Sequence, residues 1–394
     1  MERVIDLHLK NLSFDHCPDR RSKSESNKWR RYPADVLPMW VADMDCLSAP
    51  SIQQALKERV EHGVFGYGRP LPGLYELLCK RMETKYDWKV DPSWIRFSAG
   101  VIVAVNQIID AVSENGDAVL VQTPAYPPLL ETPGCRKLEC ILSPLVSDHN
   151  GRFEIDFEIL EKSITDRTRF FLFCNPHNPT GRVFTRSELE KLAEICLRHN
   201  LIILSDEIHQ DIVYSDHKHI PIASLDKEIE QRTITISSAS KTYNIAGLKC
   251  AYAIIPNKEL QSAYDNGGKG LVDSVNVLGL TATEEAFRSG DGWLKDCLGY
   301  LKNNRNYLIN EINKIKGIQV FAPEGTFLAW LDCSELMLGS SPAEFFLMNA
   351  KIAFNDGATF GDGYSNFVRM NFGCSLQMLR KAIIAMETAL NNRN

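Results

Sequence analysis

RFFLFCNPHNPTGRVFTRSELEKLAEICLRHNLIILSD, residues 169–206, carries the clearest fold signal in this chain. It starts and ends with short, continuous apolar runs, 169–174 and 201–206, which are typical of strands covered on both faces of a parallel sheet. Between them, Thr185 and Glu188 form a T-x-x-E capping box. Apolar residues then recur at helical spacing. The stretch therefore predicts a strand, a helix and a second strand in succession.

Similar apolar runs at 117–122 and 233–237 extend this pattern, so we expect an α/β fold with a mostly parallel central sheet. The last hundred residues differ, because a long helical stretch, one strand-like run and a final helix follow each other there. We predict a large domain over residues 50–289. Residues 1–49 and 290–394 are predicted to form a smaller α+β domain.

Composition narrows the class of protein. The 394 residues carry a formal net charge of −6, which argues against a nucleic-acid or anionic-membrane partner. No apolar run reaches the roughly 18 residues of a membrane span, and the first residues, MERVIDLHLKNLSF, lack the apolar core of a signal peptide. Eleven cysteines without a Cys-x-x-Cys pair indicate reduced thiols and a cytoplasmic location.

Three of the predicted strands run directly into polar residues. NPHNPTG follows 169–174, DEIH begins at Asp206 where 201–206 ends, and SASK, containing Lys241, follows 233–237. Ligands of open α/β sheets bind at the carboxyl ends of the strands. We therefore expect one site built by these three loops.

The residues of these loops suggest a cofactor. A lysine at a desolvated strand end has a disfavoured ammonium form, so the amine of Lys241 becomes a nucleophile for a carbonyl. Pyridoxal phosphate needs such a lysine for its aldehyde and a carboxylate, here Asp206, for its ring nitrogen. Ser238 and Ser240 supply candidate backbone N–H donors for its phosphate.

Other readings of the same residues have less support. Ser238-x-x-Lys241 is the spacing of a serine acyl-enzyme of the penicillin-binding type, but no K-T-G motif occurs in the chain. Neither G-x-G-x-x-G nor G-x-x-x-x-G-K-[ST] is present, which argues against a nucleotide site. A metal site is a further alternative, although YSDHKH is typical of a polar surface turn, and we predict no metal. Its ligands would be His209, Asp211, Asp216, His217 and His219.

Taken together, NPHNPTG, SDEIH and SASKTYNIAGL resemble the fold type I pyridoxal-phosphate enzymes of the aspartate aminotransferase superfamily. Within that superfamily the chain is most similar to MalY/PatB-type cystathionine β-lyases, or cysteine-S-conjugate β-lyases. Further segments look like the same branch, so the resemblance runs almost end to end. These segments are PMWVADMD (38–45), GVFGYGRP (63–70), TPAY (123–126), GTFLAWLD (325–332) and FVRMNFGC (367–374).

The resemblance implies roles for individual residues. Lys241 would form the Schiff base with the cofactor and Asp206 would pair with its ring nitrogen. Asn178 would bind the phenolic oxygen of the ring, and Tyr126 would stack on its face. Arg369 would clasp the α-carboxylate of the substrate.

The resemblance also implies how the phosphate is held. The start of a helix at Gly100, Val101 and Ile102 would grip it, since a helix N-terminus suits a dianion. Tyr67 would reach the phosphate of a neighbouring subunit, which implies a homodimer with shared sites.

Two positions depart from the common aminotransferase pattern. His209 stands where many aminotransferases have a tyrosine near the phenolic oxygen, and histidine there is typical of the lyase branch. Lys249 stands where many relatives carry a phosphate-binding arginine, and its role stays open.

The implied reaction is α,β-elimination from L-cystathionine or another L-cysteine S-conjugate, giving pyruvate, ammonia and a thiol, with Lys241 removing the α-proton. Aminotransfer between an L-amino acid and a 2-oxo acid is the alternative enzymatic activity, because it needs the same residues. A protein that keeps the fold but acts by binding a macromolecule is the alternative of another class. The intact set of chemical residues argues against it.

Overall fold

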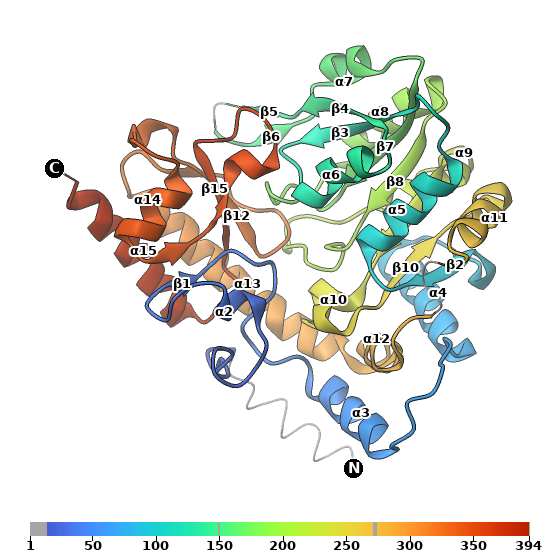
Figure 1. Cartoon of the computed structure of the whole chain (residues 1–394), viewed down its shortest axis with the longest axis horizontal. Helices are drawn as coiled ribbons and strands as arrows, with labels where there is room; N and C mark the ends of the chain where they lie inside the picture. Colours follow the sequence, from blue (N-terminus) through green and yellow to red (C-terminus); the bar gives the residue numbers. More distant parts are fainter. Residues whose placement is uncertain (1–13, 149, 271–273, 394) are drawn as a thin grey trace.

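The computed structural model describes residues 14–148, 150–270 and 274–393. Its centre is a seven-stranded sheet with the strand order β2-β10-β9-β8-β7-β3-β4 (Figure 1). From β9 to β4 every neighbouring pair is parallel, whereas β10 runs antiparallel to both β9 and β2. The strands are β2 (Ile95–Ser98), β3 (Ala118–Thr123), β4 (Glu139–Pro144), β7 (Thr168–Cys174), β8 (Ile202–Asp206), β9 (Thr233–Ser237) and β10 (Ala251–Ile254).

The four predicted strands correspond to β3, β7, β8 and β9, and the predicted mostly parallel sheet is confirmed. The capping box of Thr185 and Glu188 starts α8 (Arg186–Arg198), as predicted. Helices cover both faces of the sheet (Figure 1). One face packs with residues of α5 (Val101–Val112), α6 (Pro127–Cys135) and α11 (Lys258–Gly267), and the other packs with α7 (Phe157–Ser163), α8 and α9 (Lys227–Arg232). Continuous apolar runs are explained by this two-sided burial.

A second, antiparallel sheet lies in the C-terminal part, with the order β11-β12-β15-β14. Its strands are β11 (Gln319–Val320), β12 (Leu328–Asp332), β14 (Asn355–Asp356) and β15 (Phe367–Asn371). Two further pairs are short: β1 (Leu37–Pro38) with β13 (Ile352–Ala353), and β5 (Val146–Ser147) with β6 (Phe153–Glu154).

The predicted division at residues 50 and 290 stays a prediction. Pairing of β1 with β13 ties the N-terminal segment to the C-terminal part, but one hydrophobic cluster includes both Leu78 and Leu328 and so crosses the division. Residues 1–13 of the proposed smaller domain lie outside the described residues. The remaining helices are α2 (Asn27–Arg30), α3 (Pro50–Glu61), α4 (Pro72–Tyr86), α10 (Ala239–Thr242), α12 (Val277–Ser289), α13 (Asp291–Ile312), α14 (Pro342–Asn349) and α15 (Leu376–Asn391).

None of the helices in the described ranges is both long and apolar enough to cross a lipid bilayer.

Candidate active site

A cavity of about 650 Å³ lies at the carboxyl ends of β7, β8 and β9. The N-terminal segment and the second sheet contribute to its wall, through Trp40, Val41 and Ala42 and through Asn355 and Arg369. All predicted site residues except Tyr67 line this cavity, and Lys249 does so as well. The predicted residues in the lining are Gly100, Val101, Ile102, Tyr126, Asn178, Asp206, His209, Ser238, Ser240, Lys241 and Arg369.

Lys241 lies on the short helix α10, directly after β9. Its Nζ atom donates a hydrogen bond of 2.6 Å to the carbonyl oxygen of Ala42, 199 residues earlier in the chain. Burial and the nearby charge of Arg369 lower the pKa of Lys241 to about 8, although Asp43 and Asp206 act in the opposite direction. Near neutral pH this amine can therefore lose its proton far more readily than an ordinary lysine.

Asp206 is the last residue of β8 and is buried. Its carboxylate accepts a hydrogen bond of 3.1 Å from the backbone N–H of Ile208. Burial raises the pKa of Asp206 to about 6, against the opposing effects of that hydrogen bond and of Lys241. A buried carboxylate of this kind favours a protonated nitrogen as its partner.

Arg369 is a buried cation held by neutral groups. Its Nη1 donates to Oδ1 of Asn178 at 2.8 Å, and its Nη2 donates to Oδ1 of Asn355 at 2.7 Å and to the carbonyl of Trp40 at 3.1 Å. Its Nε has no partner among the described residues. Burial lowers the pKa of Arg369 to about 10, which shows how poorly its charge is balanced. An anionic ligand such as a carboxylate would supply the missing charge.

Asn178 follows β7 in the NPHNPTG loop and is buried. Because its Oδ1 already accepts from Arg369, its amide nitrogen remains the donor for a ligand. Tyr126 precedes α6 and is half-buried in the same wall, and burial raises the pKa of its hydroxyl.

His209 is also buried, with its ring edge-on to Phe327 at a centroid distance of 6.2 Å. Its Nδ1 has no hydrogen-bond partner within the described parts of the chain. Burial, Lys241 and Arg369 hold the pKa of His209 well below its usual value, so the ring is neutral.

The N-terminus of α5 faces the cavity through Gly100, Val101 and Ile102, and no side chain caps this helix. Its first N–H groups and the positive end of its dipole form a site for an anion. The serines at α10 differ from the expectation in one respect. The N–H of Ser240 donates to Oγ of Ser238 at 3.0 Å, so this N–H is not a free donor.

The residues of the alternative metal site have other partners. Asp211 is paired with Arg81 at 2.7 Å, and Nε2 of His219 lies 2.8 Å from Glu207. The turn at Asp216 and His217 is exposed as expected, but His219 is buried, so that part of the surface-turn prediction is wrong. Within the described ranges, no group of three or more His, Cys, Asp or Glu residues could hold a metal ion.

Tyr67 lies elsewhere in the chain, 96% exposed. It borders a second hollow of about 510 Å³, which is lined by residues 65–68 and 274–278. Tyr67 therefore does not contribute to the cavity of its own chain.

Sequence reasoning missed several lining residues. Asn27 lies on α2, and Asn355 lies on the two-residue strand β14. Neither belongs to a strand exit of the central sheet, and no sequence motif marks either one.

The cavity fits pyridoxal phosphate. It combines a lysine amine with a lowered pKa, a buried carboxylate, an uncapped helix N-terminus and an aromatic side chain. The amide of Asn178 and the unpartnered Nδ1 of His209 are further polar groups available to a ligand. These are the groups that an aldehyde, a protonated ring nitrogen, a phosphate and an aromatic ring require.

Comparisons with known proteins agree with this fit. Residues 35–386 match the family model described as aminotransferase class I and II. Cystathionine beta-lyase PatB of Bacillus subtilis is 37% identical over 398 residues, which cover 96% of this chain and all of that protein. The structure of cystalysin from Treponema denticola, which contains pyridoxal 5'-phosphate, superposes with a TM-score of 0.92 and 29% identity, covering 97% of this chain and 99% of that one. The pyridoxal-phosphate-bound C-S lyase from Staphylococcus hominis has a TM-score of 0.91 and 30% identity, with the same coverage.

Fold and site together define a pyridoxal-phosphate-dependent enzyme with the aspartate aminotransferase-like fold. The predicted fold class and cofactor are thereby confirmed. The chain belongs to the aminotransferase class I and II family, and its relatives include the cystathionine β-lyases of the predicted branch.

Proposed function

We propose that this protein is a carbon–sulfur β-lyase. It would catalyse α,β-elimination from L-cystathionine or another L-cysteine S-conjugate, giving pyruvate, ammonia and a thiol. The carrying observation is the arrangement of three groups around one cavity: the half-buried amine of Lys241, the buried carboxylate of Asp206 and the buried cation of Arg369. The names of the relatives support the same reaction class.

Each of these groups has a distinct task. Arg369 would hold the α-carboxylate of the amino acid, because a planar guanidinium suits a bidentate contact. Lys241, as a neutral amine, would take the α-proton. Bound pyridoxal phosphate supplies a conjugated ring that accepts the electron pair left at the α-carbon, and Asp206 would stabilise the protonated ring nitrogen.

The orientation of Lys241 supports its task as a base. A neutral primary amine has two N–H groups and one lone pair. If one N–H is donated to the carbonyl of Ala42, as in the structure, the directions open to the lone pair are restricted. The contact with Ala42 thus holds the amine in the cavity that Arg369 also lines.

A substrate panel tests the proposal. Purified protein would be incubated with L-cystathionine, S-alkyl-L-cysteines and L-alanine, and pyruvate, thiol and ammonia would be measured. We expect one pyruvate and one thiol per substrate consumed, and loss of both in Lys241→Ala. Lys162→Ala, at an exposed lysine of α7, is the matched control and keeps full activity. Undiminished pyruvate release by Lys241→Ala would refute the proposal.

Aminotransfer is the second candidate, and the description of the matching family favours it. The same three groups would serve it up to removal of the α-proton by Lys241, and bound pyridoxal phosphate would then supply an acceptor for that proton in place of the loss of a thiol. Rapid exchange between an amino donor and a 2-oxo acid, without thiol release from any cysteine conjugate, would identify a transferase.

We also infer a homodimer in which Tyr67 completes the cavity of the neighbouring subunit. The exposed apolar surface around this residue supports the inference: Val64 is 62%, Phe65 57% and Leu71 61% exposed. Several strongly exposed apolar side chains within one short segment are typical of a protein interface.

Mixing two inactive variants tests this inference. In a hybrid of Tyr67→Ala and Lys241→Ala subunits, one cavity has both native residues and the other has neither. An equal mixture that exchanges subunits should recover about 25% of wild-type activity, because half of the dimers are hybrids with one working site each. Each variant incubated alone is the control. A Tyr67→Ala protein that keeps full activity, or a mixture without recovery, would contradict shared sites.

A cytoplasmic location completes the proposal. All eleven cysteines are free thiols, as is usual in a reducing compartment.

A further inference from the structure

The segment Trp40–Ala42 forms one wall of the cavity through its backbone as well as its side chains. The carbonyl of Trp40 accepts from Arg369, and the carbonyl of Ala42 accepts from Lys241. The carbonyl of Val41, between them, accepts from the buried Asn371. The position of this short segment therefore fixes the backbone carbonyls that accept hydrogen bonds from Lys241 and Arg369.

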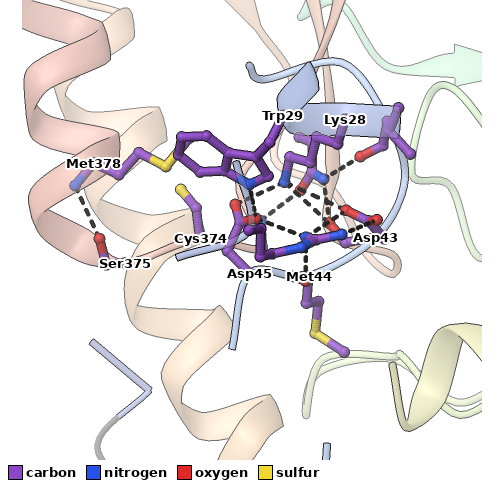
Figure 2. Close-up of polar contacts among 12 residues, drawn as sticks. Lys28, Trp29, Asp43, Met44, Asp45, Cys374, Ser375 and Met378 are labelled. Atoms are coloured by element: carbon purple, nitrogen blue, oxygen red, sulfur yellow. Dashed lines mark hydrogen bonds and ion pairs between the residues drawn. The ribbon is translucent and has the colours of Figure 1, made fainter. Parts of the chain in front are cut away.

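An ionic cluster of Arg20, Lys28, Asp43 and Asp45 adjoins the same segment at Asp43 (Figure 2). Lys28 is 1% exposed and its Nζ lies 2.7 Å from Oδ2 of Asp45, which is fully buried. Lys28 also donates to the backbone carbonyl of Asp43 at 3.2 Å, and Nε1 of Trp29 donates to Oδ1 of Asp45 at 2.8 Å. Arg20 is the second cation of the cluster. Its guanidinium nitrogens lie 2.6 Å from the carboxylate of Asp43 and 2.8 Å from that of Asp45.

The cluster is tied to the wall by chain connectivity and by one more contact. Asp43 directly follows Ala42, so fixing its carboxylate and its carbonyl limits how the preceding peptide can move. The indole Nε1 of Trp40 donates to the backbone carbonyl of Lys28 at 3.2 Å. Two formal positive charges and two formal negative charges balance within the cluster, which is the condition for burying ions at low cost.

We propose that Arg20, Lys28, Asp43 and Asp45 are positioning residues of the active site. Their balanced cluster holds the Trp40–Ala42 segment against the cavity and presents its carbonyls to Lys241 and Arg369. This inference rests on the proposed role of Lys241 as the base. It assigns a function to Asp43 and Asp45 of the PMWVADMD segment and to Arg20 and Lys28, which lie outside every motif quoted above.

The net charge of the cluster also affects the pKa of Lys241 electrostatically. The charged groups facing Lys241 are Arg369 from β15, Asp206 from β8, Asp43 from the anchored segment and Lys249 after the turn 246–248. Asp43 raises the pKa of Lys241. If a neighbouring cation of the cluster is removed, the negative charge of Asp43 and Asp45 is no longer offset, and the proton on Lys241 should be held more tightly.

Opposite charge deletions test the proposal. Lys28→Met removes a cation and Asp43→Asn removes an anion, and the double variant Lys28→Met/Asp43→Asn restores the balance. In the full-length protein freed of cofactor, the pKa of Lys241 would be measured from the pH dependence of its acetylation, followed by mass spectrometry. The pH profile of kcat/KM for cysteine conjugates would be measured on the loaded enzyme.

The expected shifts have opposite signs. We expect a higher pKa of Lys241 in Lys28→Met and a lower one in Asp43→Asn, each by roughly half a pH unit or more. The double variant should return close to the wild-type value. Leu189→Ala shortens a buried side chain of α8, far from the cluster, and leaves a cavity in the hydrophobic core. It is the control for a general loss of stability and should leave the pKa of Lys241 unchanged.

Other results would overturn the proposal. Shifts of the same sign in both single variants, or no shift in either, would show that the cluster does not act on Lys241. If Lys28→Met fails to fold, Arg20→Met takes its place as the cation deletion, because Arg20 is partly exposed. The acetylation measurement needs no lyase activity, so its outcome is independent of whether the proposed reaction is correct.

Discussion

Replacing Arg369 by methionine should greatly lower kcat/KM for the substrate but barely change the free energy of unfolding of the cofactor-free protein. Burial lowers the pKa of this guanidinium to about 10, which corresponds to about 3 kcal/mol of unfavourable free energy for the charged form in the folded protein. The substitution removes this cost and also removes three hydrogen bonds, to Asn178, Asn355 and the carbonyl of Trp40. At about 1 kcal/mol each, those bonds offset the gain. The cofactor-free protein should therefore unfold within about 1 kcal/mol of the wild type.

Arg182 provides the matched comparison. It is just as buried, but it binds the carboxylates of Glu324 at 3.0 Å and Glu188 at 2.8 Å. Arg182→Met leaves those carboxylates without their partner and should cost about 3–5 kcal/mol. Urea denaturation of both cofactor-free variants measures the difference.

Unlike the free energy of unfolding, enzymatic activity should depend strongly on Arg369. A bidentate guanidinium–carboxylate contact contributes about 3–4 kcal/mol, so kcat/KM of Arg369→Met should fall by roughly 10²- to 10³-fold. Pyruvate release from a cysteine conjugate provides the assay. If Arg369→Met loses as much stability as Arg182→Met, or keeps its kcat/KM, then Arg369 is a structural residue and the carboxylate assignment is wrong.

Three further predictions concern single side chains. The raised pKa of Asp206, about 6, means that the folded protein binds this proton more tightly than the unfolded chain, so the cost is fully present above pH 6 and is lost as the pH falls towards 4. Asp206→Asn should therefore stabilise the cofactor-free protein by about 3 kcal/mol at pH 7.5 and by little at pH 4, and equal effects at both pH values in urea titrations would contradict this. Tyr126→Leu removes an aromatic face and should weaken cofactor retention roughly three- to tenfold, measured by absorbance after dialysis, whereas unchanged retention would argue against stacking. Thr185→Ala removes the capping box with Glu188 and should lower stability by about 1 kcal/mol without changing kcat, so a loss of activity larger than the loss of folded protein would contradict a purely structural role.

Much of the central sheet could be predicted from the sequence because its signals are local. Each of the strands β7, β8 and β9 is a short apolar run, and each is followed by polar residues that end up in one cavity. Parallel strands place their carboxyl ends at one edge of the sheet. The sequence therefore predicts that residues following different strands lie close together, even when they are far apart in the chain. The roles of Asn178, Tyr126 and Arg369 came from the resemblance rather than from position, since each could equally be a residue of the core or the surface.

The rest depends on contacts that no local pattern encodes. A lysine on a short helix, such as Lys28 on α2, is expected to be exposed. Lys28 is instead buried against Asp45, 17 residues further on. The reversal of β10 relative to its neighbours could not be read from its four residues, because an apolar strand carries no mark of its direction. The polar neighbours of His219 predict a surface turn, whereas its burial depends on a tertiary contact with Glu207.

The hydrogen bond from Arg369 to Trp40 joins residues 329 positions apart. During synthesis, the segment that forms one wall of the cavity is made early, but the carbonyl of Trp40 does not meet Arg369 until almost the whole chain exists. Contacts between such distant residues form late in folding, because closing a long loop costs chain entropy before the contacts contribute any stabilisation. A growing or truncated chain can thus build much of the central sheet but cannot retain the cofactor in a complete pocket. Retention of pyridoxal phosphate in a complete pocket consequently reports that the chain extends at least to Arg369, whereas a chain that has finished folding can also lack the cofactor.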